Sequence, residues 1–306
     1  MALAFQNLEM KILIILFSFI FSFLLPTNAQ TQSTKPLSLQ VKAESGTIIW
    51  LDNLRYGTIA ESGEMTINNL QAGSHSLRAR LTGKHELTQA VIVKANATNQ
   101  VQVNFKAPAA PAEFSFQTAE TLREKGKHKD AIDEYRKALS LSKISLPRAR
   151  IGLARSLAAT SEYEDAVTEA RRAARESAAA PIIAAEAFTV VANTFRSQGL
   201  YDEAFTNYEK ALKLAHNFSP EAHTGIALNF MEENDAASAI KHLSLGAQQS
   251  NDTEPIIYYL LGNLLDRSGQ IKEAIATYEK FLALEPTGKN ANTARSLLKQ
   301  LKREAR

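Results

Sequence analysis

The sequence contains no cysteine among its 306 residues. This absence excludes a disulfide framework, a cysteine-ligated zinc or iron–sulfur site and a cysteine nucleophile, and it leaves no cysteine for lipid attachment. An excess of either charge is missing as well, since 35 Lys and Arg residues face 32 Asp and Glu residues. The formal net charge of +3 is too small to indicate a nucleic-acid-binding protein, so we expect no nucleic-acid partner.

The motifs of several common enzyme classes are also missing. The sequence has no HExxH, no GxSxG, no phosphate-binding GxxxxGKS or GxxxxGKT, and no GxGxxG. Of the six histidines, His216 and His223 have a spacing that fits one helical face, but Pro220 would interrupt a helix between them. The sequence therefore predicts a protein that is not an enzyme and that binds no metal and no cofactor.

The one long hydrophobic run lies near the N-terminus, where residues 12–25 read ILIILFSFIFSFLL. Lys11 precedes this run, and the small residues Thr27 and Ala29 follow it. These features predict a secretory signal peptide over residues 1–29, cleaved after Ala29. The mature protein would then be periplasmic or secreted, with no integral membrane span. An uncleaved membrane anchor is the alternative, although a spanning helix needs about 20 apolar residues.

Residues 37–105 alternate between apolar and polar side chains, with the period of a half-buried strand. The clearest runs are LSLQVK at 37–42, LRARL at 77–81 and VQVNF at 101–105. Turn dipeptides such as Ala72-Gly73 and Thr82-Gly83 separate the runs. About six short strands of this kind predict a small antiparallel β-sandwich.

Within this region, the segment LQAGSHSL at 70–77 combines a turn with an L-x-x-G-x-H entry into a strand, and RARLTG at 78–83 supplies a glycine after that strand. The segment resembles the PEGA-type domain of cell-envelope proteins. The resemblance implies an accessory domain with an adhesive or structural role, and not a catalytic one.

From residue 113 onward the sequence repeats itself. Turn residues at 126, 161, 199, 234 and 269 are spaced 35, 38, 35 and 35 apart, and an alanine follows each of them five positions later. Small, apolar and aromatic residues recur at further fixed distances from each turn. The pattern matches the tetratricopeptide repeat, a helix–turn–helix unit whose small residues let two helices approach closely.

The resemblance implies a multi-domain protein. A small all-β sandwich (37–105) and a Pro/Ala linker (106–112, KAPAAPA) precede an all-α superhelix, an α-α solenoid of five repeats (113–288), and a capping helix (289–306). The closing proline of the repeat is expected in the fifth unit alone, at Pro286. Phe281 replaces a small residue there, so we expect the last packing interface to be slightly open or reshaped.

Arrays of this family bind partners along a concave groove formed by the first helix of each repeat. The family register carries this property to Glu120, Arg123, Arg155, Asn193, Arg196, Asn263 and Arg267. Members that clamp the acidic tail of a chaperone need a lysine one turn before such an asparagine, where this sequence has Thr189 and Tyr259. A chaperone tail is therefore not the expected ligand.

Together these features predict a non-enzymatic interaction scaffold, in the bacterial cell envelope or outside the cell, that binds a protein or peptide in its groove. The alternative is an accessory protein that contacts cell-wall glycan through its β-domain. Trp50, the single tryptophan, and Tyr56 would then hold the glycan, whereas a packing role for Trp50 fits the alternation of its strand.

Overall fold

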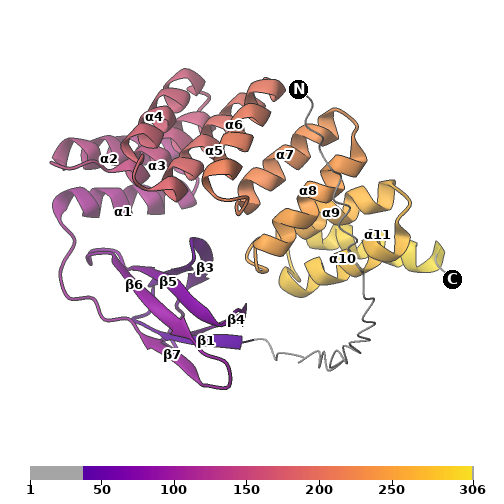
Figure 1. The fold of residues 1–306 in the computed structure, drawn as a ribbon, viewed down its shortest axis with the longest axis horizontal. Coiled ribbons are helices and arrows are strands. Elements are labelled where there is room, and N and C mark those ends of the chain that lie inside the picture. The colour runs from indigo at the N-terminus through magenta and orange to yellow at the C-terminus, as the bar shows by residue number, and fades with distance from the viewer. Residues whose placement is uncertain (1–36, 305–306) are drawn as a thin grey trace, which may run out of the picture. The chain divides into compact units, whose positions relative to one another are not determined.

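The structure is a computed structural model that describes residues 37–304. The predicted signal peptide at 1–29 lies outside the described residues. Seven strands are followed by eleven helices (Figure 1), which confirms the predicted fold class of a small β-sandwich followed by an all-α array of helix pairs. Within residues 37–304, no helix combines the length and the apolar character that a membrane span requires.

The seven strands form two sheets, β4-β1-β7 and β3-β2-β5-β6. Their bounds are β1 (Leu37–Lys42), β2 (Ile48–Leu51), β3 (Leu54–Thr58), β4 (Glu64–Leu70), β5 (Gly73–Arg80), β6 (Leu87–Val93) and β7 (Asn99–Gln102). We call residues 37–102 the β-domain. Leu39, Ile49 and Leu77 are fully buried in its single core, as the alternation predicts.

The pairing of β1 with β7 is parallel, so the prediction of a purely antiparallel sandwich was wrong. Every other strand pair in the two sheets is antiparallel. The chain leaves one sheet at the end of β6 and enters the other as β7. β6 and β7 do not form a hairpin, and β7 instead pairs with β1, with both strands running in the same direction.

The helices pair in order, α1 with α2 through α9 with α10, and α11 packs on α10. Their bounds are α1 (Pro111–Glu124), α2 (His128–Leu141), α3 (Pro147–Ala159), α4 (Tyr163–Glu176), α5 (Pro181–Ser197), α6 (Tyr201–Leu214), α7 (Pro220–Glu232), α8 (Ala236–Gln249), α9 (Pro255–Arg267), α10 (Ile271–Leu284) and α11 (Lys289–Glu304). The turn residues of the five pairs all have positive φ, from +60° at Asn234 to +76° at Gly199. This left-handed conformation ends a helix, so the predicted turn positions are confirmed.

A proline begins the first helix of every pair, at Pro111, Pro147, Pro181, Pro220 and Pro255. Proline suits this position because its missing N–H would have no partner within the helix there. These prolines occupy another position of the repeat than Pro286, which remains the closing proline of the fifth unit alone. Each of these prolines starts one helix pair, and four of them also follow the preceding pair.

A buried tyrosine joins the two helices in three of the pairs. Tyr135, Tyr208 and Tyr278 are fully buried. Each hydroxyl bonds to a side chain fifteen residues earlier on the first helix, namely Glu120, Asn193 (2.5 Å) and Asn263 (2.7 Å). Burial raises the pKa of Tyr208 to about 12, so its phenol remains a donor.

Phe281 fills the last interface instead of leaving it open. Its side chain is fully buried, and its ring centroid lies 5.3 Å from that of Tyr259. It belongs to one apolar cluster with Leu261 of α9 and Ala294 of α11. Of the two predicted alternatives, an open or a reshaped interface, the structure has the second, because this cluster accommodates the larger ring.

A histidine pair links α7 to α8. The Nδ1 atoms of His223 and His242 lie 3.1 Å apart, and the ring of Phe230 packs 5.8 Å from that of His242. Burial, then the neighbouring His223 and Lys241, lower the pKa of His242 from 6.5 to about 4. Burial also lowers the pKa of His223. Both rings are therefore neutral in the folded protein at neutral pH.

This pair makes the helical array sensitive to mild acid. Between pH 6.5 and about 4, the unfolded chain binds a proton at His242 that the folded chain does not, so stability falls as the pH decreases. After discounting for solvent screening, we expect a loss of about 1 kcal/mol between pH 7 and pH 5. Urea unfolding at both pH values measures it. His242→Gln should remove most of this loss, whereas the same result with the exposed His216→Asn would contradict the assignment.

Candidate binding site between the helical array and the β-domain

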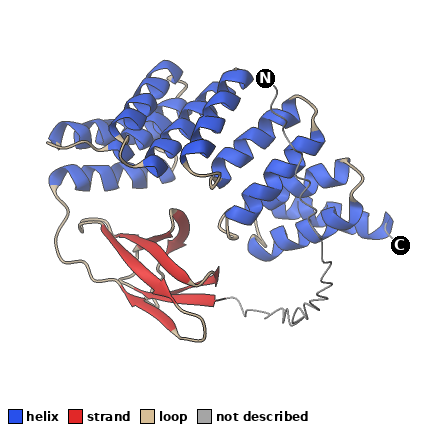
Figure 2. Cartoon of the chain, viewed as in Figure 1, coloured by secondary structure: helices blue, strands red, loops and turns tan. Residues whose placement is uncertain are grey.

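A cavity of about 530 Å³ lies between the first helices of the five pairs and strands β2, β3 and β5. In Figure 2 the strands lie on one side of the helices, and both belong to one compact unit of the chain. Because α1, α3, α5, α7 and α9 all contribute lining residues, the cavity runs across every repeat. It is therefore the candidate site for a ligand of the array.

The charges that line the cavity are balanced in number, but the cations are confined to one part of it. The six cations come from the β-domain, α1 and α3, and they are Arg55, Arg78, Arg80, Arg123, Arg148 and Arg155. The six acids are Asp52, Glu120, Glu124, Glu186, Glu221 and Glu254. Among the described lining residues, the part formed by α5, α7 and the start of α9 has acids and no cation. We call that part the acidic wall and the opposite part the arginine wall.

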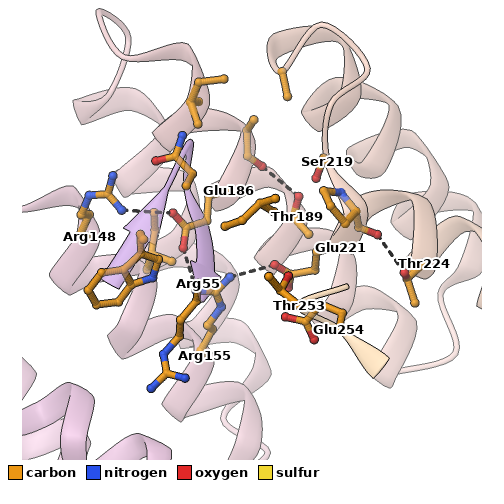
Figure 3. Close-up of a pocket in the computed structure, with 18 of the residues that line it drawn as sticks. Arg55, Arg148, Arg155, Glu186, Thr189, Ser219, Glu221, Thr224, Thr253 and Glu254 are labelled. Atoms are coloured by element: carbon orange, nitrogen blue, oxygen red, sulfur yellow. Dashed lines mark hydrogen bonds and ion pairs between the residues drawn. The ribbon is translucent and has the colours of Figure 1, made fainter. Parts of the chain in front are cut away.

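Arg155 connects the two walls (Figure 3). Its guanidinium donates to Glu186 at 2.8 Å and to Glu221 at 3.0 Å. Asn193 donates to the second oxygen of Glu221 at 2.8 Å, and Arg148 lies 3.8 Å from Glu186. Burial alone would raise the pKa of Glu186, but Arg155 and Arg148 hold it below its ordinary value. The network fixes α3, α5 and α7 relative to one another.

The structure brings together four of the seven predicted groove residues. Those that line the cavity are Glu120, Arg123, Arg155 and Asn193, and those outside it are Arg196, Asn263 and Arg267. Arg196 lies almost one turn beyond Asn193 on α5. The other two lie in the later turns of α9, whereas the cavity includes the first turn of that helix.

Glu120 and Arg123 are engaged within the chain. Glu120 accepts hydrogen bonds from the Tyr135 hydroxyl and from Arg123 at 3.1 Å, and it lies 3.5 Å from Arg80 of β5. Burial would raise the pKa of Glu120, but Arg123 and Arg80 hold it below its ordinary range. These two predicted residues therefore join the β-domain to α1, in addition to facing the cavity.

Sequence reasoning missed the acidic wall. Glu186, Glu221 and Glu254 lie close to the prolines that begin α5, α7 and α9. An acid near a helix start is common because it complements the helix dipole, so its position alone carries no functional signal. The arginines of β5 were also missed, because nothing in their strand pattern indicates that they face the helices.

The loop between β5 and β6 is bound by α1. Gln117 of α1 is buried, accepts a hydrogen bond from the N–H of Gly83 at 2.9 Å and donates to the carbonyl of Lys84 at 2.8 Å. Glu113 accepts from the N–H of Glu86 at 2.6 Å. Backbone groups that a neighbouring strand would otherwise satisfy are thus satisfied by helical side chains.

The segment between β7 and α1 binds the same loop. The N–H of His85 donates to the carbonyl of Ala107 at 2.9 Å, and the N–H of Ala109 donates to the carbonyl of Gly83 at 3.0 Å. Residues of the Pro/Ala segment therefore pair with the β-domain over part of its length. This pairing holds the β-domain against the first repeat.

Trp50 faces the cavity under two guanidinium groups. Its side chain is 7% exposed, with the guanidinium carbons of Arg78 and Arg80 at 3.9 and 5.0 Å from its ring. Arg80 also lies 4.7 Å from the ring of Phe116 on α1. Such cation–π stacking covers the face that a sugar ring would need.

The second aromatic residue of the glycan alternative is engaged as well. The side-chain amide of Asn251, in the loop before α9, donates to the Tyr56 hydroxyl at 2.7 Å and to the carbonyl of Asn68 at 3.1 Å. Near the other end of the array, Arg55 lies 3.5 Å from Glu124 of α1. The β-domain therefore contacts α1 and the loop between the fourth and fifth pairs, and the cavity lies between these two contacts.

Comparison with known protein families gives two matches to models described as tetratricopeptide repeat. One covers residues 116–181, and the other covers residues 185–218 and 256–287. The pair α7–α8 falls outside both matches, yet it has the same starting proline and the same left-handed turn. No curated protein matches the chain.

Solved structures resemble the chain at low sequence identity. A thermophilic TPR protein of Thermus thermophilus is 18% identical, over 62% of this chain and 98% of its own, with a TM-score of 0.48. PilF of Pseudomonas aeruginosa is 19% identical, over 60% and 81%, with a TM-score of 0.47. The Rap conjugation gene regulator of plasmid pLS20, in complex with the Phr* peptide, is 17% identical, over 56% and 53%, with a TM-score of 0.49.

Proposed function

We propose that the protein is a non-enzymatic interaction scaffold that binds a segment of a partner protein in the cavity, since much of its helical region matches tetratricopeptide repeat models. One observation carries this proposal. The first helices of all five repeats, which form the binding face of such arrays, line a single cavity with polar side chains such as Arg155 and Glu221.

The β-domain restricts what the cavity accepts. Its contacts with α1, and with the loop before α9, lie on the same face of the array as the cavity. A long partner helix along the whole face would have to displace those contacts. A short peptide segment fits the enclosed space, since cavities of about 300–1,000 Å³ hold ligands of that size.

We also propose that the protein acts in the cell envelope or outside the cell. The proposal rests on the hydrophobic run at 12–25 and the small residues that follow it, and on the PEGA-like pattern at 70–83. The glycan-binding alternative has less support, because Trp50 and Tyr56 already contact other parts of the chain.

Site-specific photocrosslinking tests the scaffold function. A photoreactive phenylalanine analogue replaces Thr224, which lines the cavity, or Lys241, an exposed residue of α8 outside it. In cells of the natural source, we expect a discrete crosslinked partner from position 224 and none from position 241. Adding Arg155→Gln should weaken capture about tenfold, because the two charged hydrogen bonds from Arg155 to Glu186 and Glu221 are lost. Equal adducts from both positions would contradict the proposal.

A further inference from the structure

The arginine wall contains a cation, Arg78, whose charge is only partly neutralised by the side chains around it. Arg78 lines the cavity, and its Nε atom is buried without a hydrogen-bond partner. Its ion pair with Glu86 is long, at 3.6 Å, and Glu86 also pairs with Arg80 at 2.8 Å. Burial, and next the charge of Arg148, lower the pKa of Arg78 to about 10. An anion of a ligand placed between Arg78 and Arg148 would offset both the cost of burying the Arg78 charge and its repulsion by Arg148.

The acidic wall contains an acid, Glu254, whose negative charge is only partly neutralised by the side chains around it. Glu254 precedes the first residue of α9 and lines the cavity (Figure 3). Burial and the neighbouring Glu221 raise the pKa of Glu254, and Arg55 only partly offsets them. Glu221 itself is shared between Arg155 and Asn193. A cation placed beside Glu254 would therefore gain an ion pair that residues 37–304 do not provide.

An apolar strip accompanies the two charged walls. Ile182, Phe218 and Ile256 line the cavity and remain 43%, 48% and 39% exposed. They recur near the starts of α5, α7 and α9, so the repeat sets their spacing. Large apolar side chains exposed in a row along a cavity are typical of a surface that a ligand covers.

We propose that the cavity binds a short peptide segment of mixed charge, with a carboxylate against Arg78 and Arg148 and an ammonium or guanidinium group against Glu254. Apolar side chains of the segment then cover the strip of Ile182, Phe218 and Ile256. This inference rests on the proposed function and adds the chemistry of the partner to it.

A segment of a single charge fits the cavity less well. The lining has six cations and six acids, so it offers no net attraction to either sign. An all-acidic segment would place carboxylates against Glu221 and Glu254, and an all-basic one would place cations against Arg78. Like charges brought together in this way cost affinity and exclude wrong partners.

Four capped peptides test the proposal. They share the sequence acetyl-X-Ala-Leu-Z-amide, in which X and Z are Glu and Lys, both Glu, both Lys, or both Gln. Trp50 is the single tryptophan and lines the cavity, so its fluorescence reports binding directly. For the protein expressed with its own N-terminal segment and purified, we expect the mixed-charge peptide to bind about tenfold more tightly than each of the other three.

Substitutions assign each end of the peptide to a wall. Glu254→Gln should weaken the mixed-charge peptide about tenfold and reduce its advantage over the all-acidic one. Arg148→Gln should weaken it similarly and reduce its advantage over the all-basic one. Arg148 is preferred to the buried Arg78, whose loss endangers the fold of the β-domain. The exposed Glu233→Gln and Arg136→Gln, both outside the cavity, serve as matched controls.

Three results would overturn the mixed-charge proposal: equal binding of the four peptides, no binding of any, or binding that ignores Glu254 and Arg148. The scaffold function would survive each of them if position 224 still captured a partner, since crosslinking does not depend on the partner's charge. If the all-acidic or the all-basic peptide bound instead, and Glu221→Gln changed its affinity, the cavity would remain the binding site but the mixed-charge ligand would be wrong.

Discussion

Replacing Gly225 by alanine is expected to destabilise the protein by about 2 kcal/mol, because overpacking a filled core costs about 1–3 kcal/mol. Gly225 lies inside α7, where alanine would ordinarily stabilise a helix by about 1 kcal/mol. A Cβ atom there would lie 2.2 Å from Cζ and 2.3 Å from the hydroxyl oxygen of Tyr208. Tyr208 is fully buried and bonded to Asn193, so its ring has no free space to enter.

Denaturant unfolding followed by circular dichroism measures this effect. The same close approach recurs at Gly152, where an added Cβ atom would lie 2.4 Å from the Tyr135 ring, and less severely at Gly262, where it would lie 2.9 Å from the Tyr278 ring. The expected order of destabilisation is therefore Gly225→Ala, then Gly152→Ala, then Gly262→Ala. In a double-mutant cycle, Tyr208→Leu should remove most of the cost of Gly225→Ala. If Gly225→Ala made the protein more stable, the gain in helix propensity would exceed the cost of the clash with Tyr208, and α6 and α7 would have to lie farther apart than in the structure.

Replacing Gln117 by alanine is expected to release the β5–β6 loop from α1. The change leaves the N–H of Gly83 and the carbonyl of Lys84 without their partners. Unsatisfied groups of this kind cost about 1–3 kcal/mol, so we expect a loss of about 2 kcal/mol in the contact of the β-domain with the first repeat. Amide hydrogen exchange at Gly83 should accelerate about thirtyfold.

Two other substitutions on α1 make this prediction specific. Gln117→Glu keeps the acceptor for Gly83 but turns a buried carboxylate oxygen toward the carbonyl of Lys84 and toward Glu113, so its effect should be at least as large as that of alanine. The hydroxyl of Thr118 bonds within its own helix, to the carbonyl of Phe114 at 2.9 Å, so Thr118→Ala should leave the exchange of Gly83 unchanged. Unchanged exchange in all three variants would mean that the loop is held by the linker segment alone.

The repeat could be predicted from the sequence because its signals are local. The turn at Gly199 and the small residue Ala204 lie five residues apart, and the helix geometry they require is set within one pair. The tyrosine contact with Asn193 spans fifteen residues, also within one pair. Periodicity therefore placed the first helices, and with them Glu120, Arg123, Arg155 and Asn193, on the face that forms the cavity.

Pro220 interrupts the helix between His216 and His223 as predicted, since α6 ends at Leu214 and α7 begins at Pro220. The sequence was less informative where a residue's role depends on its neighbours in space. Phe281 has the size that predicts an open or reshaped interface, but the residues that accommodate it come from α9 and α11. Asn263 has the residue type of a groove contact, yet the cavity does not extend along α9 beyond its first turn.

The sequence by itself determined that strands precede helices, that the helices pair, and which side chains fill each pair, since these properties depend on residues close together in the chain. The tertiary structure alone decided that the β-domain covers the binding face and that the arginine wall supplies the cations described in the cavity. Those features depend on contacts such as Tyr56 with Asn251, which lie 195 residues apart. No local periodicity encodes such a contact, because it requires two parts of the chain that are far apart in sequence to meet.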